Sequence, residues 1–230
     1  MESDLVGAAD NTIHRMAGDE RRQQLLEVAM HLFSKHGFSG TTTKRIAEEA
    51  GVSEAMVFKH FENKDQLYTD IIDHKACSLG MESPMSVLSD FVEAKNDFGV
   101  FYHLALNALN HHRQDTEFIR LLLHSALEGH AMARTFFDSY VTTIYESIGE
   151  YIEERQKDGA FREVNPKIVV RAFSGMFIHH SMTNIIWDKD QKLLKVSNER
   201  AAKEFATVLL DGIRKKDSSS DEQNSTQVQS

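Results

Sequence analysis

The chain has 230 residues, 41% of them hydrophobic and 27% charged, which is the ordinary balance of a water-soluble globular protein. Its single cysteine, Cys77, excludes an intrachain disulfide, and no apolar run approaches the roughly 18 residues of a membrane span. A formal net charge of −9 argues against binding nucleic acid by charge alone, since phosphate contacts need Lys and Arg. The N-terminus lacks a basic start followed by an apolar run, so we expect no signal peptide, no membrane partner and a cytoplasmic location.

Residues 1–18 show no sustained hydrophobic period, and we expect them to form a disordered arm. A helix is predicted from Asp19 onward, because apolar residues then recur three and four positions apart up to a stop at Gly37. The residues of this apolar stripe are Leu25, Val28, Ala29, Leu32 and Phe33. We expect this helix to cover the back of the segment that follows it.

The segment 41–64 has the pattern of two short helices joined by a sharp turn. A threonine at position 41, 42 or 43 can cap the first helix, since its hydroxyl accepts an orphan backbone N–H. Gly51 lies where that helix must stop, at a position that favours a positive φ, and Ser53 can cap the second helix. The residues that the second helix buries are Val57 and Phe61. A short turn containing glycine between two helices is typical of a helix-turn-helix motif.

The charge of this segment supports DNA binding only weakly. Between residues 35 and 64 there are five Lys or Arg residues and four Glu residues, so the segment is almost balanced. Neutralisation of phosphates by Lys and Arg supplies most of the non-specific affinity of proteins for DNA. The geometry of the two helices is therefore the stronger indication of DNA binding.

The rest of the chain predicts helices separated by breaks, without an alternating strand pattern. The predicted helices span 64–79, 84–95, 98–112, 115–129, 131–157, 166–187 and 198–215. Pro84 and Pro166 each follow a good N-cap residue, and proline is tolerated at the first position of a helix. Residues 217–230 lack an apolar stripe, so we expect a second disordered tail. The fold class is predicted to be all-α.

The helix-turn-helix segment resembles the DNA-binding domain of the TetR family of transcriptional regulators. The residues that carry the resemblance are Thr42-Thr43-x-x-Ile46-Ala47-x-x-Ala50-Gly51-Val52-Ser53 and Phe58-x-His60-Phe61-x-x-Lys64. With the helix before it and the start of the helix after it, the resemblance covers about residues 20–75. It implies a three-helix head at 19–64 and a larger helical body at 65–216, about nine helices in all, in which the body binds an effector and dimerises.

The resemblance also implies which residues of the head contact DNA. Positions that usually touch phosphates are matched by Thr42, Thr43, His60 and Lys64, and positions that face base edges by Lys44, Ala55, Met56 and Lys59. Two residues depart from the family pattern. Phe58 replaces the more usual tyrosine, which removes a hydroxyl contact to phosphate but keeps the ring. Glu54 brings a carboxylate near the groove, where it either accepts from cytosine N4 or repels phosphate.

Aromatic and methionine residues of the body are core by default, but the resemblance favours a small-molecule cavity among the middle helices. The predicted lining consists of Tyr102, His103, Leu106, His124, Phe137, Tyr140, Phe173, Met176 and Phe177. The predicted helix 166–187 is apolar on more than one face, and 198–215 carries an apolar stripe. Two such helices at the end of the chain indicate a subunit interface. The predicted interface residues are Ile178, Met182, Ile185, Phe205, Leu209 and Ile213.

The twelve histidines indicate neither a metal site nor a catalytic site. The adjacent pairs His111–His112 and His179–His180 cannot converge on one ion from a helix, and neither His-Glu-x-x-His nor Cys-x-x-Cys occurs. We therefore expect no metal, no cofactor and no catalytic residue. Single histidines such as His103, His124 and His180 fit a helical interior better than a ligand set.

These observations predict a ligand-responsive DNA-binding regulator rather than an enzyme. We expect a repressor that binds a palindromic double-stranded operator as a homodimer and is released by a small, mostly apolar effector. Two alternatives remain open: a constitutive or architectural DNA-binding protein without an effector, and a helical-bundle enzyme that uses buried histidines.

Overall fold

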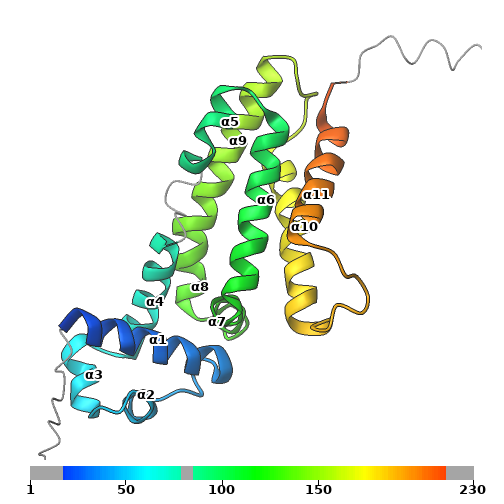
Figure 1. Ribbon diagram of the computed structural model, residues 1–230. Coiled ribbons are helices and arrows are strands. Elements are labelled where there is room, and N and C mark those ends of the chain that lie inside the picture. The colour runs from blue at the N-terminus through cyan, green and yellow to red at the C-terminus, as the bar shows by residue number, and fades with distance from the viewer. Residues whose placement is uncertain (1–17, 79–84, 216–230) are drawn as a thin grey trace, which may run out of the picture. The chain divides into compact units, whose positions relative to one another are not determined.

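The computed structural model describes residues 18–78 and 85–215, and these residues are helical with short connections (Figure 1). Within them no strand occurs, apart from an isolated bridge between Phe161 and Arg214. The predicted all-α class is confirmed. The predicted tail 217–230, the predicted break at 80–84 and all but the last residue of the predicted tail 1–18 lie outside the described residues. Gly18 is the first residue of α1. Across the described ranges, no helix is both long and apolar enough to cross a membrane.

The chain divides into two compact units, the first ending at Ile71 and the second beginning at Ile72. This division falls inside α4 (Lys64–Ser78), whereas the sequence predicts a boundary at 64/65. The helix therefore contributes its first half to one unit and its second half to the other.

The first unit contains α1 (Gly18–His36), α2 (Thr43–Glu49), α3 (Glu54–His60) and the start of α4. Side chains from all four helices are buried in it. They include Leu25, Ala29, Leu32 and Phe33 of α1, Ile46 and Ala47 of α2, Val57 of α3, and Leu67, Tyr68 and Ile71 of α4. The Phe33 and Tyr68 rings meet edge to face, with centroids 4.6 Å apart. Burial of these apolar side chains gives α2 and α3 a fixed support.

The second unit is a helical bundle. Its elements are η1 (Ser86–Leu88), α5 (Ser89–Glu93), α6 (Asp97–Gln114), α7 (Thr116–Leu127), α8 (Ala131–Phe136), η2 (Phe137–Val141), α9 (Thr142–Lys157), α10 (Pro166–Met182), η3 (Thr183–Trp187) and α11 (Asn198–Ile213). Helix α6 lies against α10 and α11, and α10 also lies against α9 (Figure 1). Pro166 is the first residue of α10, as predicted, and Asn165 caps it.

The structure divides one predicted helix. Residues 131–157 form α8 and α9 with the π-helical turn η2 between them, and 166–187 ends in a second π turn, η3. A π turn adds one residue to a helical turn. This change in the spacing of apolar residues is too small for the turn to be predicted from the sequence. The number of helices in the described residues is close to the nine expected, and the π turns contribute to the difference.

A buried ionic cluster joins the start of α6 to the end of α9. The Asp97 carboxylate accepts from Tyr151 Oη at 2.7 Å and from Arg155 Nε at 2.7 Å, and these three side chains are largely buried. Burial and the bond to Asp97 raise the pKa of Tyr151 above its usual range, so its phenol remains a donor at neutral pH. Arg155 also donates to Asp158 at the protein surface.

We predict that Asp97→Asn destabilises the second unit by about 3 kcal/mol, because it removes the buried one of the two carboxylates that pair with Arg155. Urea denaturation followed by circular dichroism measures this change. The matched control is Asp158→Asn, which removes an exposed partner of the same guanidinium and should lower the midpoint less. Equal midpoints for Asp97→Asn and the parent chain would contradict the assigned role of the cluster.

Candidate nucleic-acid interface

The corner between α2 and α3 is built by backbone geometry. Gly51 has φ of +67°, a left-handed conformation that strains residues with a Cβ. Its N–H donates to Glu48 O at 3.2 Å, and the N–H of Val52 donates to Ala47 O at 2.9 Å. These two bonds satisfy the last carbonyls of α2 in the Schellman pattern. The predicted stop at Gly51 is therefore present.

Side-chain caps begin both short helices. Thr42 Oγ1 accepts from Arg45 N at 3.1 Å, which selects Thr42 among the three candidate threonines. Ser53 Oγ accepts from Met56 N at 3.3 Å and caps α3 as predicted. Each cap satisfies a backbone N–H that the helix leaves unpaired. Thr41 instead is fully buried and its hydroxyl contacts the carbonyls of Leu32 and Gly37.

Helix α3 has one face in the core and one face in solvent. Val57 and, just after the helix, Phe61 are almost completely buried, as predicted. Ala55, Phe58 and Lys59 are exposed, with 49% of the Phe58 surface accessible to solvent. The Lys59 ammonium makes no hydrogen bond or ion pair within the described residues. This helix can therefore present a chemically mixed surface to a groove without any change in its packing.

The other residues predicted to contact DNA differ in their solvent exposure and in the bonds that their side chains make. Thr42 is exposed, and Lys44 is exposed with Glu48 4.0 Å from its ammonium. Met56 and His60 are half-buried. The Thr43 hydroxyl donates to Glu54 Oε1 at 2.6 Å, so these two predicted contacts are bonded to each other.

Lys64 has a structural role that the sequence does not reveal. Its ammonium donates to Phe38 O at 2.9 Å and to Thr41 O at 3.0 Å. The same nitrogen lies 3.9 Å from the centroid of the Phe38 ring. Since an ammonium has three donors, two of them are used to hold the connection between α1 and α2. The predicted phosphate contact is left with one donor.

Arg45 is an exposed basic residue of α2 that is absent from the predicted contacts. Its guanidinium Nη2 lies 3.1 Å from His36 Nε2. Its place beside the N-cap Thr42 is a signal that could have identified it. An exposed arginine is able to contact phosphate bidentately.

The predicted effector residues differ in their burial within the second unit. Phe173 and Phe177 are buried in the core of the second unit, where Phe173 contacts Phe101 edge to face. Tyr140 is also buried, and Phe137 is exposed. Tyr102 and His103 are partly buried, and their rings contact each other. Tyr140 donates its hydroxyl to Asp73 of α4 at 3.1 Å. The remaining members, Leu106, His124 and Met176, are half-buried.

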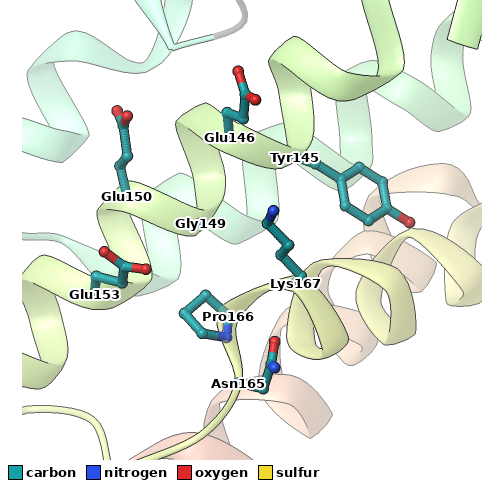
Figure 2. Close-up of a pocket in the computed structure, with 8 residues that line it drawn as sticks. All are labelled: Tyr145, Glu146, Gly149, Glu150, Glu153, Asn165, Pro166 and Lys167. Atoms are coloured by element: carbon teal, nitrogen blue, oxygen red, sulfur yellow. The ribbon is translucent and has the colours of Figure 1, made fainter. Parts of the chain in front are cut away.

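A pocket of about 410 Å³ lies between α9 and the start of α10 (Figure 2). None of the predicted effector residues lines it. Its walls are formed by Tyr145, Glu146, Gly149, Glu150, Glu153, Asn165, Pro166 and Lys167. Figure 2 shows Lys167 and Pro166 facing α9. The site is open and acidic, unlike the enclosed apolar cavity that was expected.

A buried polar pair in the second unit was missed. His112 Nδ1 of α6 lies 2.9 Å from Ser181 Oγ of α10, and burial lowers the pKa of His112 to about 4, with neighbouring His111 adding to the shift. The imidazole is therefore neutral at pH 7. Its place on α6, three residues after buried Leu109, is the signal that could have found it. Within the described ranges no cluster of His, Cys, Asp or Glu could hold a metal ion.

Three of the predicted dimer residues are turned into the chain's own core. Ile185, Leu209 and Ile213 are at most 9% exposed, so they have little surface to offer a partner. Met182 and Phe205 are half-buried, and Ile178 is 43% exposed. Other apolar side chains of this region are exposed, namely Ile168, Ile186, Trp187 and Val208. Of the predicted interface residues, Ile178, Met182 and Phe205 therefore keep surface that a partner could cover.

We predict that Lys64→Met destabilises the first unit by about 1–3 kcal/mol, because two buried carbonyl bonds and a ring contact lose their donor. Thermal unfolding measures the loss. Lys59→Met is the matched control, since its ammonium has no partner within the described residues, and it should change stability by less than about 0.5 kcal/mol. Equal losses for both variants would contradict the role assigned to Lys64.

Comparison with known proteins identifies the first unit. Residues 25–71 match the family described as bacterial regulatory proteins, tetR family. The nucleoid occlusion factor SlmA of Haemophilus influenzae is 41% identical over 63 residues, which are 27% of this chain and 29% of that protein. The regulator AcrR of Shigella flexneri is 35% identical over 66 residues, 29% of this chain and 31% of its own length. The chain thus spans less than a third of the length of each of these two relatives.

The likeness of fold extends further than the likeness of sequence. A protein of Saccharomonospora viridis, assigned as a transcriptional regulator and solved in complex with choline, superimposes with a TM-score of 0.64 at 16% identity. The superposition covers 86% of this chain and all of that one. We conclude that residues 25–71 form a helix-turn-helix domain of the tetR family of bacterial regulatory proteins.

Proposed function

We propose that the chain is a ligand-responsive transcriptional repressor of the cytoplasm that binds a palindromic operator as a homodimer. The observation that carries this proposal is the solvent-facing surface of α3, supported from behind by Val57 and Phe61. The family match assigns the same segment to DNA-binding regulators, which leaves the enzymatic alternative without support.

A two-fold dimer would place two α3 helices on successive major grooves. In helix-turn-helix dimers the half-sites lie roughly 34–36 Å apart, so the operator repeats the symmetry of the protein. Support for a dimer comes from apolar side chains that α10 and α11 leave in solvent. These are Ile168 and Ile178 on α10 and Val208 on α11, with Gly175 able to let a partner helix approach. We propose these residues in place of the buried part of the predicted interface.

Effector release would act through α4, because this helix belongs to both units. In the second unit its Asp73 accepts from Tyr140 at 3.1 Å, and its Lys75 pairs with Asp115 at 2.5 Å. Tyr140 lies in the π turn η2 and contacts Phe136, which in turn contacts Phe118. A small, mostly apolar ligand that bound among these rings would displace the Tyr140 hydroxyl from Asp73. The hydrogen bond between η2 and α4 would then be lost.

The coupling free energy that release from the operator requires is modest. A coupling of roughly 1–3 kcal/mol between ligand and operator changes operator affinity about 5–150-fold. The ligand must bind the released conformation better, since equal binding to both conformations shifts nothing. The choline complex of the Saccharomonospora viridis protein makes small molecules of that size a reasonable first class to screen.

A second candidate is a DNA-binding protein that needs no effector. It is favoured by the match to a nucleoid occlusion factor and by the burial of the predicted effector residues Phe173 and Phe177 in the core. A ligand screen decides between the two, because only the first candidate predicts a ligand that changes operator affinity.

We predict that Lys59→Ala weakens binding to a selected operator about tenfold, since an exposed lysine of α3 can donate to guanine O6 or N7. A gel-shift titration against DNA selected from a random pool provides the measurement. Lys203→Ala, which removes an exposed lysine of α11, should leave the affinity unchanged. If Lys59→Ala binds as tightly as the parent chain, α3 is not the reading surface.

We predict that Tyr140→Phe reduces the effect of a releasing ligand on operator affinity at least threefold, because the bond to Asp73 is lost while the ring remains. The ratio of operator affinities with and without ligand reports this coupling. Tyr145→Phe is the matched control, since its hydroxyl has no hydrogen bond within the described residues. An unchanged ratio in Tyr140→Phe would remove Tyr140 from the coupling route.

A further inference from the structure

We propose that Glu54 is a specificity-determining residue that reads a cytosine in each half-site, and that Thr43 positions its carboxylate. The proposal rests on the proposed function, since it concerns the surface through which the chain would read DNA. Its physical basis is the hydroxyl–carboxylate bond between the first residue of α2 and the first residue of α3.

The bond fixes one half of the Glu54 carboxylate. Thr43 Oγ1 donates to Glu54 Oε1 at 2.6 Å, and both residues are half-buried. Glutamate is a long side chain that normally loses much rotamer freedom when it binds a ligand. Here that freedom is already restricted before DNA arrives, so less of it remains to be lost.

The other half of the carboxylate is available. Oε2 has no hydrogen-bond partner within the described residues, and no Lys or Arg there forms an ion pair with Glu54. An ionised carboxylate can only accept, and it has about four lone-pair sites. The neighbouring Lys44 lies 4.0 Å from Glu48 rather than in a pair with Glu54. No cation of the described residues is therefore paired with Glu54.

A carboxylate on a surface that approaches phosphates is unfavourable unless it finds a donor. The major groove offers two donors, the N4 amino group of cytosine and the N6 amino group of adenine. Adenine has the acceptor N7 beside its N6 donor, and this acceptor repels a carboxylate. Guanine presents two acceptors, O6 and N7, and both atoms repel a carboxylate. Cytosine is the base that offers a donor edge to Glu54, and its preference should appear once in each half of a palindrome.

The substitution Glu54→Gln separates base reading from a purely structural bond. Glutamine keeps the shape and can still accept from Thr43, but its amide both donates and accepts, which matches adenine N6 and N7. We expect the parent chain to select cytosine about tenfold over other bases at one position per half-site. Glu54→Gln should lose this preference and move toward adenine there, with the other positions unchanged.

The test is selection of operators from a random DNA pool with each purified full-length protein, followed by sequencing. Glu54→Ala should lose the cytosine preference without gaining adenine. Thr43→Val should weaken the preference at the same position, because it removes the positioning hydroxyl, whereas Thr43→Ser should retain it. Thermal unfolding midpoints of all the variants show whether the first unit is still folded.

The outcomes separate the two proposals. A parent chain that enriches no sequence overturns the proposed function and the base reading together. An enriched palindrome whose base preferences are the same for the parent chain and for folded Glu54→Gln and Glu54→Ala overturns the base reading alone. In that case the bond between Thr43 and Glu54 only holds α2 against α3.

Discussion

The left-handed conformation of Gly51 is the constraint on which the reading surface depends. It ends α2, turns the chain, and places Ser53 where it can cap α3 within a few residues. The direction of α3 is then held by burial of Val57 on one side and Phe61 at its end. A residue with a Cβ at position 51 would meet no neighbouring atom, so the constraint lies in backbone conformation rather than in space.

Lys64 holds another part of the same unit, the connection between α1 and α2. Its ammonium joins two carbonyls of the connection between α1 and α2, while its ring contact with Phe38 continues into the buried pair Phe33 and Tyr68. These contacts tie α1, α4 and the connection between α1 and α2 together in the first unit. Within that geometry the carboxylate of Glu54 is held by the neighbouring Thr43 hydroxyl.

The sequence predicted the local features well, because they depend on residues close together in the chain. The stop at Gly51, the cap at Ser53 and the buried pair Val57 and Phe61 follow from spacing alone. Features that join distant segments were not predictable in this way. Tyr140 and Asp73 are 67 residues apart, and the carbonyls that bind Lys64 belong to backbone atoms that no side-chain pattern marks. Aromatic composition likewise cannot separate a core residue such as Phe173 from a residue that lines a cavity, because both need apolar surface.

The central claim is that two copies of α3 read two half-sites of one operator. A hydroxyl-radical footprint on DNA selected from a random pool tests it most directly. The account predicts two protected segments related by two-fold symmetry, with centres roughly 34–36 Å apart along the helix axis. A single protected segment, or protection without sequence preference, would contradict it.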